Sequence, residues 1–286
     1  SGIMVGASLV ALAAFGLRPG IDLSGGAAWR IAISAVSSTV PIDAALVKQK
    51  LAAHVEREIH VKTSSDGTFV VRLPEITEEE HAAYTKELQT FGTVEEKSFS
   101  SIGPVIGSEL REKAMWAIVL VLVGISFYIA WAFRKVSLPV KSWKYGVVTL
   151  VTLFHDVVIP AGMLAILGRA YGVEIDTNFI VALLVVMGFS VHDTIVVFDR
   201  IPENLLVRRG SRMSFGDIVN YSVNETLARS VNTSLTLIIV LVALIVFGPP
   251  SLFYFILTML VGTVFGTYSS IFVASPLLYL WGRKAG

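Results

Sequence analysis

Residues 188–204 read GFSVHDTIVVFDRIPEN, and they end a long apolar run, 179–198, that contains an aspartate, Asp193. An α-helix rises about 1.5 Å per residue, so about 20 apolar residues cross the hydrocarbon core of a bilayer. The run therefore predicts a membrane-spanning helix in which Asp193 lies roughly 6–7 Å from the centre. An acid at that depth costs about 2.5–3.5 kcal/mol on insertion scales unless it is protonated, paired or hydrated. Such a cost favours a role in moving protons, ions or a substrate. The alternative is a buried acid that serine or amide partners hold, or that pairs with an arginine, for packing alone.

The composition indicates a polytopic α-helical membrane protein. Of the 286 residues, 54% are hydrophobic and 16% are charged, whereas soluble domains are about 25% charged. Six apolar runs predict six transmembrane helices, at 3–17, 115–133, 145–167, 179–198, 231–247 and 252–281. The first run is short and has no basic leader. We therefore interpret it as the remainder of a membrane helix with a truncated start, in preference to a cleaved signal peptide.

These runs divide the chain into three parts. We expect a first transmembrane helix at 1–21, a periplasmic α+β domain at 22–113, and a five-helix transmembrane domain at 114–286 with a cytoplasmic loop at 199–230. Basic residues gather on one side of the six-span arrangement, mainly in 133–144, in the cytoplasmic loop and in the C-terminal tail. The positive-inside rule places that side, and both termini, in the cytoplasm. The domain then lies outside, and its 10 basic and 14 acidic residues give it a net negative charge.

The pattern of the external domain alternates between strands and helices. Strand-like segments lie at 28–35, 58–62, 68–73 and 94–102, and helical segments lie at 41–55 and 78–91. A capping box from Thr77 to Glu80 opens the second helix, and Asp66-Gly67 predicts a turn between the middle strands. The order βαββαβ predicts a ferredoxin-like domain.

No pattern in the chain predicts an enzyme, a metal site or a nucleic-acid-binding surface. His54, His60 and His81 lack the spacing of metal ligands and are interpreted as surface or edge residues. No basic tract with interleaved aromatic residues suggests nucleic acid. The chain has no cysteine, so it forms no disulfide and carries no thiol chemistry. We expect no cofactor apart from a transported ion.

The candidate ion-coupling residues include two acids that lie within apolar runs. Asp193 is expected to form an ion pair with Arg229, which precedes the fifth run at a compatible depth; the alternative is that Arg229 extends to the cytoplasmic surface. Separation of the pair would let the acid take up a proton and would couple proton entry to helix movement. Asp156 lies near the middle of the third run beside His155. His155 is either a proton relay or a hydrogen-bond partner that merely satisfies the acid.

Small residues predict close helix packing in the fourth and last runs. They are Gly188, Ser190, Gly262, Gly266, Ser269 and Ser270. The two glycines of the last run form a GxxxG motif, which favours packing within the protein. A second capping box, from Ser214 to Asp217, predicts a helix in the cytoplasmic loop. That helix either lies on the membrane or binds a partner.

Four motifs, in order along nearly the whole chain, resemble the SecF members of the SecD/SecF family, in the resistance-nodulation-division superfamily. They are DLSGG at 22–26, GPVIGSEL at 103–110, the stretch 188–204, and GTYSSIFVASP at 266–276. Each motif is modest, but four in sequence with a six-span layout are highly specific. By motif position, Asp193 matches the family's membrane aspartate and Arg229 matches its arginine near the fifth span. Asp199 and Arg200 match the charged end of the same signature.

Two residues depart from the family pattern. His192 stands where asparagine is commoner in the family, and it adds a titratable group beside Asp193. His192 is therefore a further ion-coupling candidate. Pro202 stands where arginine is commoner, and it is expected to shape the exit from the fourth helix because proline disfavours helix at the residue before it.

The resemblance implies a subunit of the Sec protein-export machinery of the bacterial inner membrane. With SecD, it would use the proton or sodium gradient to promote late steps of polypeptide translocation, without being an enzyme. The implied partners are SecD, the SecYEG channel, YidC, SecA, the unfolded exported polypeptide and membrane lipid. One alternative is a half-sized small-molecule exporter of the same superfamily, for which the external domain is too small. The other alternative is an assembly subunit without ion coupling.

Overall fold

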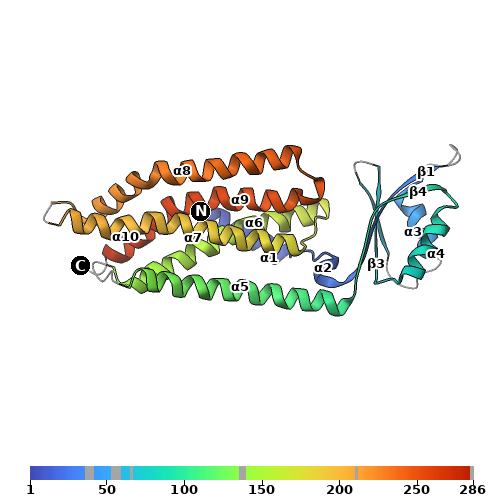
Figure 1. Cartoon of the computed structure of the whole chain (residues 1–286), viewed down its shortest axis with the longest axis horizontal. Helices are drawn as coiled ribbons and strands as arrows, with labels where there is room; N and C mark the ends of the chain where they lie inside the picture. The colour runs from blue at the N-terminus through green and yellow to red at the C-terminus, as the bar shows by residue number, and fades with distance from the viewer. Residues whose placement is uncertain (36–41, 53–58, 65–66, 135–139, 210–211, 284–286) are drawn as a thin grey trace. The chain divides into compact units, whose positions relative to one another are not determined.

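The computed structural model describes residues 1–35, 42–52, 59–64, 67–134, 140–209 and 212–283. The chain forms two compact units. The helical unit consists of Ser1–Arg18 and Met115–Gly286, and the α/β unit consists of Pro19–Ala114. Figure 1 labels most of the helices and strands of both units.

The helical unit is built from long apolar helices. They are α1 (Gly2–Phe15), α5 (Pro104–Ala132, from Met115 onward), α6 (Ser142–Tyr171), α7 (Thr177–Val207) and α8 (Phe215–Phe247). A last helical run follows, made of η1 (Pro250–Leu252), α9 (Phe253–Ser269), the π-helical turn η2 (Ser270–Ala274) and α10 (Ser275–Arg283). Among the described residues, five helical segments are long and apolar enough to cross a membrane, while α1 is shorter. The chain is therefore a multi-pass membrane protein, and the sixth span stays a prediction.

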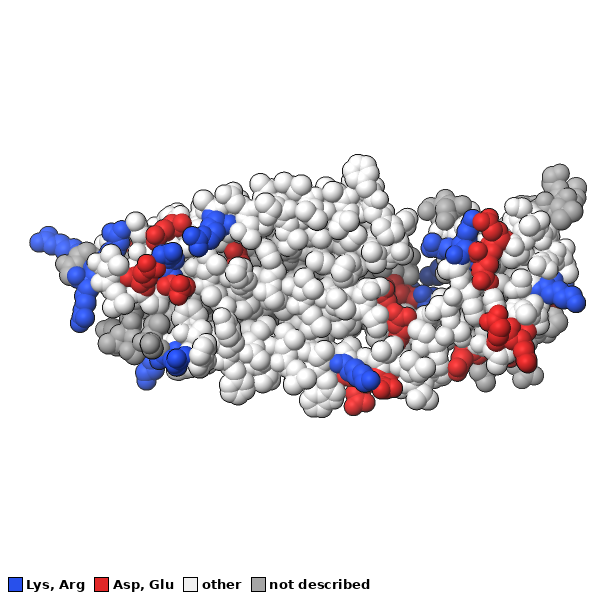
Figure 2. Space-filling model, viewed as in Figure 1, with Lys and Arg blue, Asp and Glu red and all other residues white. Residues whose placement is uncertain are grey.

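The interior of the helical unit is formed mainly by α6, α7 and the last helical run. In their most apolar stretches 61%, 50% and 44% of the residues are buried, against 6% in α5 and 17% in α8. A β-carbon at Gly262 on α9 would overlap Val186 on α7, and one at Gly162 on α6 would overlap Ser8 on α1. Glycine at these positions therefore permits close packing of the helices. Figure 2 shows a broad band of the helical unit without charged side chains.

Residues 199–230 are largely helical rather than a loop. α7 continues to Val207, and α8 starts at Phe215. The predicted capping box is confirmed: Ser214 Oγ accepts from the backbone N–H of Asp217 at 3.2 Å, and Asp217 Oδ2 accepts from the backbone N–H of Ser214 at 2.9 Å. It opens the helix of the fifth predicted span itself, so the separate surface or partner-binding helix is not present. A helix of 33 residues is about 50 Å long, which exceeds the hydrocarbon core and leaves its polar start outside.

α7 also runs through Pro202, so the prediction that this proline shapes the end of the helix is wrong. Proline removes one backbone donor and disfavours helix before it. Contacts beside it stabilise the last turns of α7: Asn204 Nδ2 donates to Ser222 Oγ and to Glu225 Oε2 on α8, each at 3.0 Å. Ile201 is fully buried in the same turns.

The α/β unit is a sheet covered on one face by two helices. Its elements are α2 (Ile21–Ser24), β1 (Gly26–Ala35), α3 (Ala44–Ala52), β2 (His60–Thr63), β3 (Phe69–Leu73), α4 (Glu78–Leu88) and β4 (Gly92–Ile102). The described strands form an antiparallel sheet in the order β2-β3-β1-β4. α3 and α4 lie on the same face (Figure 1), where Trp29, Leu51 and Val71 are fully buried. The predicted succession of strands and helices is present, with α2 as an addition.

Some local predictions for the α/β unit are settled and others are not. The capping box between Thr77 and Glu80 is confirmed. Asp66 of the predicted turn, residues 41 and 53–55 of the first predicted helix, and His54 lie outside the described residues. His81 is buried rather than on the surface. Its ring stacks on Phe99, and its Nε2 lies 2.8 Å from a carboxylate oxygen of Glu96.

The DLSGG and GPVIGSEL motifs pack against each other within the α/β unit. Gly25 and Gly26 have φ angles of 76° and 114°, a conformation that favours glycine. A β-carbon at Gly107 would lie 2.5 Å from the backbone nitrogen of Gly25, and one at Gly25 would lie 2.7 Å from the Cα of Pro104. The glycines of both motifs are therefore needed where two backbones touch.

Candidate functional site

Asp156 is the centre of a buried hydrogen-bond cluster that joins three helices. Its side chain has no solvent exposure. His155 Nδ1 lies 2.7 Å from Asp156 Oδ1, as predicted for a neighbouring hydrogen-bond partner. The hydroxyls of Ser190 on α7 and Ser269 on α9 donate to Asp156 Oδ2 at 2.5 Å and 2.7 Å. These partners stabilise an acid that would be costly by itself in a membrane interior.

Asp193 is the second buried acid of this region. Asp193 is 4% exposed, and its Oδ2 accepts a hydrogen bond from Ser270 Oγ at 2.7 Å. It lies three residues after Ser190 on α7, and residues at that spacing share a helix face. The carboxyl group therefore lies inside the protein with a polar partner, and not against lipid.

Consecutive residues of the last helical run contact both acids. Ser269 ends α9, and Ser270 begins the π-helical turn η2. Ser275 Oγ donates to the backbone carbonyl of Ser270 at 3.0 Å, across that turn. π-Helical turns within α-helices are frequent at functional sites. We name the group formed by the two acids and their three serines the carboxyl–serine cluster: Asp156, Asp193, Ser190, Ser269 and Ser270.

Arg229 does not pair with Asp193 in this structure, although both residues belong to its described part. Arg229 on α8 is exposed, whereas Asp193 is buried and contacts Ser270. The exposed position agrees with the alternative interpretation, in which the guanidinium extends to the surface. His192 is also exposed, because neighbouring residues of a helix point in different directions. Neither residue joins the carboxyl–serine cluster.

Some buried polar atoms of the helical unit have no hydrogen-bond partner, and two of them belong to residues next to the acids in sequence. Among the described residues these include His155 Nε2, Thr194 Oγ1 and Ser230 Oγ. An unsatisfied buried polar atom costs about 1–3 kcal/mol, so each one calls for an explanation. When His155 donates from Nδ1 to the carboxylate, its Nε2 is left as an acceptor.

The predicted glycines make different contacts. A β-carbon at Gly266 would lie 3.2 Å from the Cβ of Ser190, so Gly266 brings the last helical run next to the carboxyl–serine cluster. Gly262, one turn earlier, meets Val186. Gly188 has open space around its Cβ position and makes no close packing contact there with the described atoms. The packing predicted for Gly188 is therefore not seen.

The charged end of the fourth predicted span lies at the protein surface. Asp199 is exposed, and Arg200 Nη1 lies 2.6 Å from Glu203 Oε2. An exposed pair of this kind contributes about 0–1 kcal/mol. Asp199 and Arg200 mark a boundary and take no part in the buried cluster.

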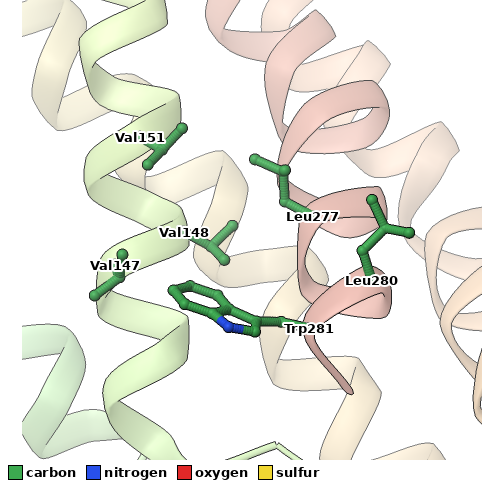
Figure 3. A pocket seen from close by; sticks show the side chains of 6 residues that line it. All are labelled: Val147, Val148, Val151, Leu277, Leu280 and Trp281. Carbon is green, nitrogen blue, oxygen red and sulfur yellow. The ribbon is translucent and has the colours of Figure 1, made fainter. Parts of the chain in front are cut away.

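An apolar cavity of about 320 Å³ opens between α6 and α10. Figure 3 shows its lining by Val147, Val148, Val151, Leu277, Leu280 and Trp281. None of these side chains is ionisable, and none belongs to the carboxyl–serine cluster. The cavity is therefore not suited to ion chemistry.

Apart from His155, the particular residues that hydrogen-bond the two acids were not predicted from the sequence. Ser269 and Ser270 were identified only as small residues that favour packing. Two polar residues side by side in an apolar run are a signal, because each needs a hydrogen-bond partner when buried.

No group of three or more His, Cys, Asp or Glu side chains that could hold a metal ion occurs among the described residues.

Comparisons with known proteins place these observations in a family. The chain matches the family described as protein export membrane protein SecD/SecF, C-terminal, over residues 82–284. The protein translocase subunit SecF of Thermobaculum terrenum is 47% identical over 278 residues, which cover 94% of this chain and 86% of the relative. That of Anaerolinea thermophila is 35% identical over 281 residues, covering 97% and 89%. The protein translocase subunit SecDF of Thermus thermophilus is 35% identical over 227 residues, covering 79% and 29%.

Solved structures of SecDF are similar to this chain. The crystal structure of SecDF, a translocon-associated membrane protein from Thermus thermophilus, has a TM-score of 0.81 and 31% identity, and covers 98% of this chain. A structure of SecDF in a super-membrane-facing form has a TM-score of 0.68 and 30% identity. This chain spans 37% of each of those longer chains. From the family match and from relatives similar over most of their length, we conclude that the chain belongs to the SecD/SecF family of protein export membrane proteins.

Proposed function

We propose that this chain is a SecF-type subunit that works with SecD in Sec-dependent protein export. In this proposal, the two subunits use a proton or sodium gradient to promote late steps of polypeptide translocation. The observation that supports it is the carboxyl–serine cluster, in which two buried acids are connected through adjacent hydroxyls of a third helix. The relatives named SecDF support SecD as the partner.

The membrane gradient supplies enough free energy to change the arrangement of the helices. One charge that crosses a potential of 100 mV releases about 2.3 kcal/mol. That amount shifts a balanced two-state equilibrium by more than tenfold, because about 1.4 kcal/mol corresponds to a factor of ten. A change of protonation in the cluster alters contacts of α6, α7 and the last helical run together. The uptake or release of the ion is thereby coupled to the packing of these helices.

In this proposal the helices alternate between two arrangements, and Arg229 pairs with Asp193 in the second one. α8, which carries Arg229, packs against both α7 and α9. A shift of α8 brings the guanidinium to Asp193 and replaces the hydrogen bond from Ser270 with an ion pair. Asp193 then alternates between a neutral partner and a charged one.

The α/β unit acts as an external domain in the same proposal. The positive-inside rule supports a bacterial inner membrane protein with cytoplasmic termini and a periplasmic α/β unit. Its strand order supports a ferredoxin-like topology, and its edge strands β2 and β4 offer backbone groups to an extended polypeptide by strand addition. The SecYEG channel, YidC and SecA are proposed as further partners. No enzymatic reaction and no cofactor beyond the transported ion is proposed.

The test replaces Asp193 with asparagine in the intact export complex. Asparagine keeps the shape of the side chain and an acceptor for Ser270, but it does not ionise. We expect Asp193→Asn to lose the part of export that depends on an imposed gradient in membrane vesicles, with co-purification of SecD unchanged. The exposed Glu203→Gln serves as the matched control. Full gradient-dependent export by Asp193→Asn would remove the ion-coupling function and favour an assembly subunit.

A further inference from the structure

Two serines of the carboxyl–serine cluster each lie between two hydrogen-bond acceptors. Ser269 Oγ lies 2.7 Å from Asp156 Oδ2 and 3.0 Å from the backbone carbonyl oxygen of Gly266. Ser270 Oγ lies 2.7 Å from Asp193 Oδ2 and 2.9 Å from the backbone carbonyl oxygen of Thr267. A hydroxyl has one hydrogen to donate and two lone pairs to accept with. Each serine is therefore able to donate to the acid or to its own helix.

We propose that Ser269 and Ser270 are paired hydroxyl switches that allow the two acids to take up and release protons without losing a hydrogen bond. This inference rests on the proposed ion-coupling function. With the carboxylate ionised, the serine hydroxyl donates to it. With the carboxyl protonated, the new O–H group donates to the serine oxygen, and the hydroxyl turns to the backbone carbonyl. One O–H bond forms on the acid, and no heavy atom has to move.

The donor set of the cluster favours a proton as the transported ion. The oxygens of Asp156 lie against an imidazole nitrogen and two hydroxyls, and these groups donate hydrogen bonds to a carboxylate. In transporters, sodium is coordinated by carbonyl oxygens of unwound helix segments. Here the carbonyls of Gly266 and Thr267 lie in α9, within reach of the serine hydroxyls. The oxygen atoms near the acids are thus arranged for hydrogen bonds.

The position of the serines couples the two acids to each other. Neighbouring side chains on a helix diverge by about 100°, so Ser269 and Ser270 reach acids on two different helices, α6 and α7. A rotation of the last helical run at η2 changes both contacts at once. The serines are positioning residues, because they act through the carboxyl groups.

Other titratable or charged groups lie on the helices that pack around this site. α6 contributes His155, α7 contributes His192, α8 contributes Arg229 and α9 contributes Tyr268, whose ring stacks with that of His155. The serine substitutions leave all four of these groups in place. A change of profile on serine substitution is therefore attributable to the hydroxyls.

The experiment compares Ser269→Ala and Ser270→Ala with Ser269→Thr and Ser270→Thr, which keep a hydroxyl. Ser234→Ala is the matched control, because Ser234 is a buried serine of the same unit whose hydroxyl contacts Ser230 and Thr267 and no acid. Export is measured in vesicles that hold the complete complex, across a range of pH, with an imposed proton gradient or an imposed sodium gradient.

We expect each alanine variant to lose about tenfold in proton-driven export, because a buried acid without its donor is disfavoured. We also expect each alanine variant to shift the pH optimum, whereas the threonine variants and Ser234→Ala keep it.

Alanine variants with the parent pH profile would overturn the inference. Threonine variants that fail like the alanine variants would also overturn it, because the hydroxyl would not then be the determinant. Export driven by sodium alone and insensitive to the serines would overturn the switch but keep the ion-coupling function, whereas full activity of Asp193→Asn would remove both.

Discussion

At the scale of residues, the two buried acids differ in how many partners hold them. Asp156 is contacted by His155, Ser190 and Ser269, whereas Asp193 is contacted by Ser270. Removing Asp156 leaves His155 and Ser190 without their acceptor, whereas Ser269 and Ser270 each keep a backbone carbonyl as an alternative acceptor. Each unsatisfied buried donor costs about 1–3 kcal/mol. The stability of the helical unit therefore depends more on Asp156.

We predict that Asp156→Ala destabilises the protein by at least about 2 kcal/mol more than Asp193→Ala, because more buried donors lose their acceptor. Thermal unfolding of the purified complex in detergent measures the difference. Asp199→Ala is the control, since substitutions at exposed sites change stability by no more than about 0.5 kcal/mol. Equal stabilities of the two buried variants would show that the partners of Asp156 contribute nothing.

Arg229 allows a test that separates stability from activity. Its side chain is exposed and forms no ion pair with Asp193 in this structure. We predict that Arg229→Gln changes stability by no more than about 0.5 kcal/mol but loses gradient-dependent export, because the second state lacks its cation. The exposed Arg212→Gln keeps both properties. Retention of full export by Arg229→Gln would remove Arg229 from the mechanism.

The sequence reveals the acids of the site more readily than their partners. Asp156 and Asp193 are conspicuous because acids within apolar runs are costly. Ser269 and Ser270 are inconspicuous because serine is common in membrane helices, where it permits close packing. Their role depends on the register between distant helices and on the π-helical turn η2, neither of which has a reliable local signal.

At the scale of elements, the helices extend beyond the apolar runs that predict them. Hydropathy locates the part of a helix inside the bilayer, but α7 and α8 continue as polar helices outside it. The interhelical contacts of Asn204 stabilise these extensions. Such contacts join residues far apart in sequence, so a local pattern around Pro202 does not reveal them.

The glycines of the fourth and last predicted spans provide a matched pair for testing helix packing. A β-carbon at Gly262 would overlap Val186, whereas the Cβ position of Gly188 has open space. We predict that Gly262→Leu separates α7 from α9 and costs about 1–3 kcal/mol or more by overpacking, while Gly188→Leu is tolerated. Thermal stability and co-purification with SecD measure the effect.

A compensating substitution checks the cause of that loss. Gly262→Ala is also expected to lose stability, because its β-carbon alone would overlap Val186. Val186→Ala removes two methyl groups from the contact, so it is expected to recover part of the stability lost by Gly262→Ala. No recovery in the double variant would show that the overlap with Val186 is not the origin of the cost. Such pairs in direct contact are expected to depart from additivity by about 0.5–3 kcal/mol.

At the scale of the whole molecule, the division into a helical unit and an α/β unit was predictable because it depends on composition summed over many residues. Apolar runs mark the helical unit, and alternating patterns mark the strands of the α/β unit. The contact between the DLSGG and GPVIGSEL motifs was not predictable in this way. It joins residues far apart in sequence, and only the close approach of Gly25 to Pro104 and Gly107 explains it.

The proposed orientation leads to a prediction that the sequence makes easy to test, because it contains no cysteine. Single cysteines can therefore be placed without background labelling. Glu79 on α4 and Arg212 before α8 are both exposed, and Val242 on α8 is 45% exposed within an apolar stretch. A maleimide that does not cross membranes reacts with a thiol only where water reaches it, since the thiolate is the reactive form.

We predict that Glu79→Cys is labelled in cells with a permeabilised outer membrane, that Arg212→Cys is labelled only after the inner membrane is opened, and that Val242→Cys resists labelling in both conditions. Labelling of Arg212→Cys before the inner membrane is opened would reverse the orientation, and the direction of ion flow through the carboxyl–serine cluster would have to be reversed with it.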